Sequence, residues 1–98
     1  MIDISTFPDT YLAIQSILDE RCRQNQEHPK GLPVAQRMLT IGEEYGELCE
    51  AATAYVYPEA HDPSGEYDLP LSHRRAALRR EAVQLAAVTL RLIEEMDR

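Results

Sequence analysis

The spacing of apolar residues constrains the fold of this chain most, because it follows a helical period in three separate stretches. The first opens around Pro8 and extends to about Gln26. The second begins at Pro33, whose missing N–H is tolerated in a first helical turn, and runs to Tyr55 or Val56. No stretch alternates polar and apolar residues as a strand would. The apolar positions of the first stretch are Leu12, Ile14, Ile17, Leu18 and Cys22.

A third helix of about 25 residues is predicted to end near the C-terminus, with Ser72 as its N-cap. Its apolar stripe consists of Leu78, Leu85, Val88 and Leu92. Residues 57–71 contain prolines, a glycine and short polar residues, which predicts a loop. We therefore expect one domain over residues 1–98, folded as an all-α antiparallel bundle of three to four helices. With only 98 residues to build a core, the bundle is expected to be completed by homo-oligomerisation.

Composition excludes several functional classes. A formal net charge of −7 disfavours nucleic acid and anionic membranes as partners, since both need a cationic surface. No apolar run approaches the roughly 20 residues that span a bilayer. Cys22 and Cys49 are too few and too far apart for a zinc motif, and no leader segment is evident. We expect a cytoplasmic protein with both thiols reduced and packed in the core.

An acidic segment, Gly42 to Glu50, lies within the second helix. Residues three and four apart share a helix face, so Glu43, Glu47 and Glu50 align, with Glu44 beside Glu47. One interpretation is a solvated face of an amphipathic helix, opposite an apolar side that includes Met38 and Tyr45. The other is a site for a hard cation such as Mg²⁺, because no Lys or Arg follows four residues away. Gly46, unfavourable within a helix, permits the close approach of a neighbouring helix or ligand.

The third helix adds two polar residues to this pattern. Glu81 and Gln84 share the face that carries its apolar stripe, so both point toward the packed side, where a carboxylate needs a partner. That partner is either a cation such as Arg79 or Arg80, or a metal ion. In the second case, both helices would contribute oxygen ligands, as in metal sites of helical bundles.

The segments Glu43-Glu44-Tyr45-Gly46-Glu47 and Glu81-Ala82-Val83-Gln84 resemble the EExxE and ExxD motifs of the MazG-like all-α nucleoside triphosphate pyrophosphohydrolases. Two flanking segments, Asp19 to Gln24 with the nearby His28-Pro29, and Arg79 to Val88, are similar to short bacteriophage members. The resemblance implies Mg²⁺-dependent hydrolysis of a (deoxy)nucleoside triphosphate to a monophosphate and pyrophosphate, with Mn²⁺ as a substitute. It also implies a homodimer or homotetramer in nucleotide-pool control, in a bacterial or phage-infected cell.

By this resemblance, the catalytic residues are Glu43, Glu44, Glu47 and Glu81. Glu44, Glu47 and Glu81 would ligate the metal, while Glu43 would be a further ligand or would orient the attacking water. Gln84 stands where the family has Asp, so it would offer a neutral carbonyl oxygen as a ligand. This change leaves the number of metal ions open. The segment between Glu47 and Glu81 is also longer than usual, and the predicted loop absorbs the difference.

Candidates for binding the rest of the nucleotide are Lys30, Arg75, Arg79 and Tyr55. Arginine suits phosphate because of its forked donors, although pairing with surface carboxylates is the alternative for each. Tyr55 near the end of the second helix is a candidate for stacking on a base, whereas Tyr45 is predicted to be in the core. The base and sugar preference does not follow from these residues.

A competing hypothesis is a non-catalytic helical module, in which the acidic face binds a basic partner or the chain binds a nucleotide without hydrolysing it. The replacement of Asp by Gln84 keeps this alternative open. Metal binding distinguishes the two hypotheses, because only the enzyme is expected to be stabilised by Mg²⁺.

Overall fold

A computed structural model describes residues 3–61 and 69–98 of the chain. A short 3₁₀ turn, η1 (Ile4–Thr6), precedes helix α1 (Pro8–Glu27), helix α2 (Val34–Val56), the single turn α3 (Pro58–His61) and helix α4 (Leu71–Met96). These described residues contain no strand, so the all-α prediction is confirmed.

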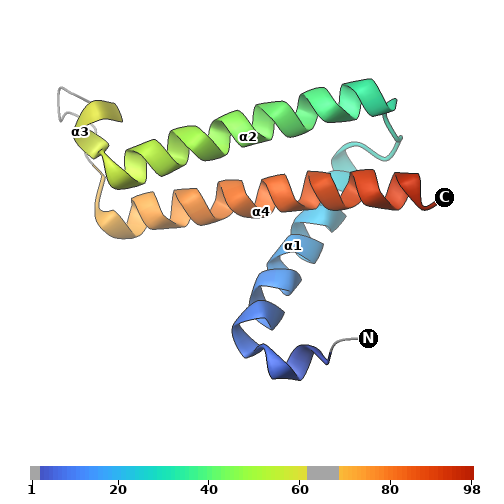
Figure 1. Cartoon of the computed structure of the whole chain (residues 1–98), viewed down its shortest axis with the longest axis horizontal. Helices are drawn as coiled ribbons and strands as arrows, with labels where there is room; N and C mark the ends of the chain where they lie inside the picture. The colour runs from blue at the N-terminus through green and yellow to red at the C-terminus, as the bar shows by residue number, and fades with distance from the viewer. Residues whose placement is uncertain (1–2, 62–68) are drawn as a thin grey trace.

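Helices α2 and α4 form a long antiparallel pair, and α1 crosses the C-terminal half of α4 at a steep angle (Figure 1). Within the described residues, α1 packs against α4 but not against α2. The N-terminal half of α1 therefore projects away from the pair (Figure 1).

Prolines fix where the helices begin. Pro8 occupies the first turn of α1, and Pro33 directly precedes α2. The prediction that Ser72 caps the last helix is wrong, because Pro70 precedes it and its carbonyl accepts the N–H groups of His73 and Arg74. The loop prediction for residues 57–71 is also wrong at both ends, since α3 occupies 58–61 and α4 begins at 71. Residues 62–68 lie outside the described part of the chain.

The side of α2 that faces α4 carries Arg37, Ile41, Glu44 and Leu48, which are three or four residues apart and are all buried or half-buried. This differs from the prediction that placed Tyr45 in the core, because its side chain is 60% exposed. The helix is rotated so that Glu44, not Tyr45, approaches α4. Among the described elements, α4 is the only long helix that contacts α2, so α2 does not bury a broad apolar face.

The apolar core of the described chain is small, with only Ala87 and Val88 fully inside. Cys22 and Cys49 are exposed, so the expectation that both thiols pack in the core is wrong. The open angle of α1 explains the exposure of Cys22, since no third helix covers its outer side. Many large apolar side chains are consequently exposed, including Leu12, Leu39, Val56 and Met96.

Buried arginines replace part of the missing apolar core. Arg37 donates through Nη2 to Glu95 Oε1 at 2.8 Å, and Arg21 donates through Nε to Glu94 at 2.8 Å. Arg91 donates through Nη2 to the backbone carbonyls of His28 and Lys30 at 2.7 and 3.0 Å. These bonds attach α1, α2 and the loop between them to the C-terminal half of α4.

None of the described helices is both long enough and apolar enough to cross a bilayer.

Candidate metal centre and adjacent cavity

Three carboxylates from two helices meet near the middle of the α2–α4 pair. Glu44 and Glu47 lie one turn apart on α2, and Glu81 faces them from α4. One carboxylate oxygen from each residue lies within 4.8 Å of the others. Glu44 and Glu81 are half-buried, whereas Glu47 is exposed. The antiparallel pairing of α2 and α4 thus brings together residues far apart in the sequence.

The electrostatics of this cluster favour a cation. Burial raises the pKa of Glu44 from its ordinary value, and repulsion from Glu47 and Glu81 raises it further. The pKa of Glu81 is raised for the same reasons, burial first and the charge of Glu47 second. Three negative charges at this separation would repel one another by about 1 kcal/mol per pair even with water-like screening.

Unpaired oxygens give a second sign that a ligand belongs here. Glu44 Oε2 and Glu81 Oε2 are buried and have no hydrogen-bond partner among the described residues. Arg80, the alternative partner for Glu81, approaches only at 3.8 Å and is largely exposed. Buried carboxylate oxygens normally have partners, so a cation that accepts oxygen ligands fits this arrangement.

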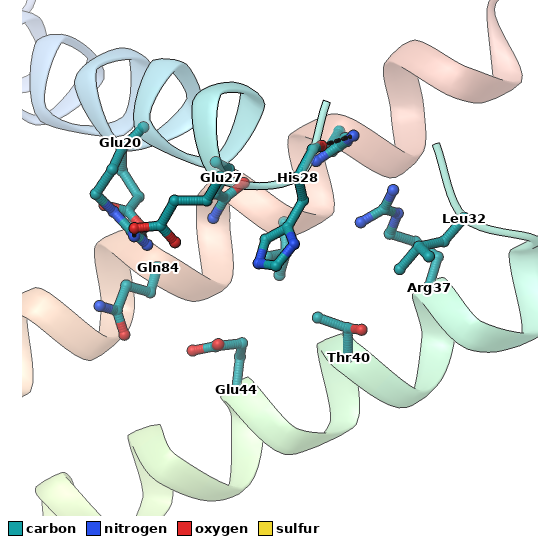
Figure 2. Close-up of a pocket in the computed structure, with 12 residues that line it drawn as sticks. Glu20, Glu27, His28, Leu32, Arg37, Thr40, Glu44 and Gln84 are labelled. Atoms are coloured by element: carbon teal, nitrogen blue, oxygen red, sulfur yellow. Dashed lines mark hydrogen bonds and ion pairs between the residues drawn. The ribbon is translucent and has the colours of Figure 1, made fainter. Parts of the chain in front are cut away.

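A cavity of about 330 Å³ opens beside the cluster, between α1, α2 and α4. Glu44 belongs to both the cluster and the cavity. Figure 2 shows Glu20 and Glu27 reaching the cavity from α1, Thr40 and Arg37 from α2, and Gln84 from α4. The other lining residues are Arg23, Gln24, His28, Leu32, Val88 and Arg91.

The predicted metal ligands do not all share one location. Glu44, Glu47 and Glu81 converge, while Glu43 is exposed and lies outside their cluster. Gln84, one turn after Glu81, is half-buried and lines the cavity together with Glu44. Gln84 therefore lies on the cavity side of the cluster.

The four residues predicted to bind the rest of a nucleotide do not line this cavity. Lys30 and Arg75 are exposed. Arg79 donates through Nη2 to Ser16 Oγ of α1 at 2.9 Å, a contact with a hydroxyl and not the carboxylate pairing that was the alternative to phosphate binding. Tyr55, eleven residues beyond Glu44, lies about 16 Å further along α2.

Sequence reasoning missed the polar residues that surround the cavity, above all Gln24, Arg37 and Arg91. A signal was available, because Arg91 follows Ala87 and Val88 by four and three residues and so continues the apolar stripe of α4. A charged residue in phase with a buried stripe indicates a partner inside the fold. The cavity depends on how α1 and α2 each pack against α4, which the pattern of neither helix alone contains.

No protein-family model, curated protein or solved structure matches this chain.

Proposed function

We propose that the chain is a MazG-like nucleoside triphosphate pyrophosphohydrolase that uses Mg²⁺, or Mn²⁺ in its place. The observation that carries the proposal is the convergence of Glu44, Glu47 and Glu81, two of which have buried oxygens without a partner in the described part of the chain. The resemblance of their two segments to the family motifs supports it independently of the geometry.

In this proposal, Glu44, Glu47 and Glu81 hold the cation. A divalent ion bound there would neutralise phosphate charge and help to position water for in-line displacement. Water adds to the α-phosphorus, the bond from that phosphorus to the bridging oxygen breaks, and pyrophosphate leaves. Gln84 would contribute a neutral oxygen on the cavity side, and exposed Glu43 stays a candidate for orienting the water.

The proposal includes a homodimer or homotetramer. Its support is the very small apolar core together with large exposed apolar side chains on α1, α2 and α4. The setting would be nucleotide-pool control in the cytoplasm of a bacterial or phage-infected cell, which rests on the resemblance alone.

The test is to incubate the pure chain with each common NTP and dNTP plus Mg²⁺ or Mn²⁺, and to resolve the products by anion exchange. Monophosphate and pyrophosphate are expected in equal amounts. Glu47→Gln should lower kcat/KM at least about 100-fold, since loss of even a supporting group at a metal site costs 10–100-fold. Glu59→Gln, which removes an exposed carboxylate on α3, is the matched control.

If no triphosphate yields these products with either metal, the hydrolase proposal is wrong. Absence of both hydrolysis and metal binding would favour the alternative, a helical module whose acidic face binds a basic partner.

A further inference from the structure

A row of exposed, uncharged residues runs along the whole of α2. Its members are three, four or seven residues apart and therefore share one side of the helix; they are Val34, Met38, Gly42, Tyr45, Cys49 and Val56. The charged residues of α2, a helix that the structure describes throughout, all lie at least about 100° around the helix from Met38. Met38 is 52% exposed and Tyr45 is 60% exposed, so large side chains of this row are open to solvent.

Helix α4 carries a similar row beside it. Leu71, Ala82, Ile93 and Met96 are exposed and share one side of α4, and Arg75 is the charged residue of that side. Both rows lie on the opposite side of the α2–α4 pair from the cavity. Thr40, which lines the cavity, is two residues and hence about 160° around α2 from Met38. Gln84 has the same relation to Ala82 on α4. We call the two rows together the free face.

The amount of exposed surface indicates what covers the free face. The chain exposes 7333 Å², whereas a compact monomer of 11.2 kDa exposes about 5,700 Å². Its radius of gyration, 15.9 Å, also exceeds the value of about 13 Å for a compact domain of 100 residues. The excess area of roughly 1,600 Å² falls within the range of about 1,000–2,500 Å² that each partner of an obligate homodimer buries. A second copy of the chain therefore accounts for the excess.

The sizes of the side chains fit two copies that meet at the middle of the free face. Tyr45 lies at the midpoint of α2 (Val34–Val56), with Gly42 one turn before it, and Ala82 lies near the midpoint of α4 (Leu71–Met96). A Cβ added to Gly42 would meet no atom within 4 Å, so the space above this glycine is open to a neighbouring helix. The larger apolar residues of the free face lie nearer the helix ends.

The charge of the chain restricts which surfaces of two copies can meet. At a formal net charge of −7, two copies repel each other unless the contact avoids their acidic residues. Glu43, Glu47 and Glu50 are exposed on the other side of α2. A contact through the free face keeps these carboxylates of both copies outside the interface.

We propose that the free face binds the free face of a second copy about a two-fold axis near Tyr45, with the two α2 helices antiparallel. Tyr45 of each copy packs over the partner's Gly42. Each carboxylate cluster and each cavity then lies on the outer side of the dimer. The proposal specifies the interface of the homo-oligomer that the proposed function includes, and on that oligomer it rests. It requires neither metal nor nucleotide.

The first test measures the mass of the full chain in EDTA by light scattering over a series of protein concentrations. The wild type should have at least twice the chain mass of 11.2 kDa. Met38→Glu should raise the dimer Kd at least about 100-fold, because a two-fold contact contains the new charge twice and the two charges repel. Circular dichroism should show unchanged helix content, since Met38 is exposed in the single chain.

Leu39→Glu is the matched control. It introduces the same charge at a residue that is 68% exposed and lies about 100° around α2 from Met38. Its Kd should stay within about threefold of the wild type, as for surface substitutions outside an interface. A monomeric wild type, or an equal rise in Kd in both variants, would overturn the proposal.

The second test uses the wild type alone, so it does not depend on a variant that folds. Cys22 and Cys49 are both exposed in the single chain, but only Cys49 belongs to the free face. In the dimer, Cys49 should react with iodoacetamide at least about tenfold more slowly than Cys22, because thiol reactivity depends on exposure. The rates in urea correct for intrinsic reactivity. Equal corrected rates in the native protein would contradict the proposed interface.

Gly42→Leu tests the close approach of the two α2 helices. Because no atom of its own chain lies within 4 Å of the added Cβ, the variant should fold. Its dimer Kd should nevertheless rise at least about tenfold, since the partner's Tyr45 would meet an overpacked site. A tighter dimer would contradict the placement of the axis.

The interface and the hydrolase function fail separately. A dimer with these properties that hydrolyses no triphosphate would keep the interface and overturn the hydrolase function. A monomeric wild type that hydrolyses triphosphates would keep the hydrolase function and overturn the interface.

Discussion

Removal of the charge of Glu44 is expected to stabilise the metal-free protein. In Glu44→Gln, the repulsion of this carboxylate by Glu47 and Glu81 disappears, and a neutral amide replaces a carboxylate whose buried oxygen has no partner among the described residues. Coulomb's law at the 4.8 Å limit of the cluster gives about 3.5 kcal/mol per pair at an effective dielectric of 20, and about 0.9 kcal/mol in water. Because Glu47 is exposed, we take the lower value.

The expected gain in unfolding free energy is therefore about 1–2 kcal/mol in EDTA at pH 7. For a domain of this size, each kcal/mol corresponds to about 4–8 °C in Tm. With Mg²⁺ the wild type should become more stable than Glu44→Gln. An ion present at 100 times its Kd stabilises the wild type by about 2.7 kcal/mol, and the variant lacks one of the side chains that bind the ion. Glu44→Gln should therefore have the higher Tm in EDTA, and the wild type should have the higher Tm in Mg²⁺. This result is expected of a carboxylate that destabilises the metal-free fold and binds the metal.

The assay is differential scanning fluorimetry at one fixed protein concentration, because the Tm of an oligomer depends on concentration. Glu43→Gln is the matched control, because it removes an exposed charge one residue away from Glu44. The repulsion between Glu43 and Glu47 that it also removes is worth only about 0.2–0.5 kcal/mol. A lower Tm of Glu44→Gln than of wild type in EDTA, with an undiminished response to Mg²⁺, would refute the reasoning.

Three further outcomes are expected. The pKa values of Glu44 and Glu81 are raised, so the folded state holds these protons more tightly than the unfolded state does. The stability of the metal-free protein should therefore fall as pH rises above about 4.5. Measuring the Tm in EDTA across pH 4.5–7 checks this. Gln84→Asp should raise Mg²⁺ affinity about tenfold by calorimetry if residue 84 contacts the ion, and an unchanged affinity would place it outside the site. Arg91→Met should cost about 2 kcal/mol in urea unfolding and speed amide exchange in the α1–α2 loop, because two backbone carbonyls lose their donor.

Periodicity and proline placement were sufficient to predict the three long helices, because both act locally. Pro33 and Pro70 stop or start helices whatever surrounds them. The single turn at Pro58–His61 was missed, since four residues are too few to show a period. The N-cap assigned to Ser72 was wrong because the observed N-cap is Pro70, two residues earlier, and the helix begins at Leu71.

The rotation of α2 was the main error in the interior. Tyr45 was assigned to the core on the assumption that several helices cover α2, yet within residues 3–61 and 69–98 α4 is the one long helix that contacts it. Packing against α4 instead selects the side that carries Arg37 and Glu44. That Glu81 lies close to the α2 carboxylates agrees with one of the two interpretations left open by the sequence, in which an acidic residue in an apolar stripe needs a partner. The cavity was not, since it depends on the angle of α1.

The separation of α1 from α2 has a consequence for how a chain of this kind diversifies. The convergent carboxylates belong to the α2–α4 pair, whereas four of the side chains around the cavity, Glu20, Arg23, Gln24 and Glu27, come from α1. Substitutions on α1 therefore change the lining of the cavity and leave the identities of Glu44, Glu47 and Glu81 as they are. Under the proposed function, this arrangement would let ligand preference change on one helix while the metal ligands stay on the other two.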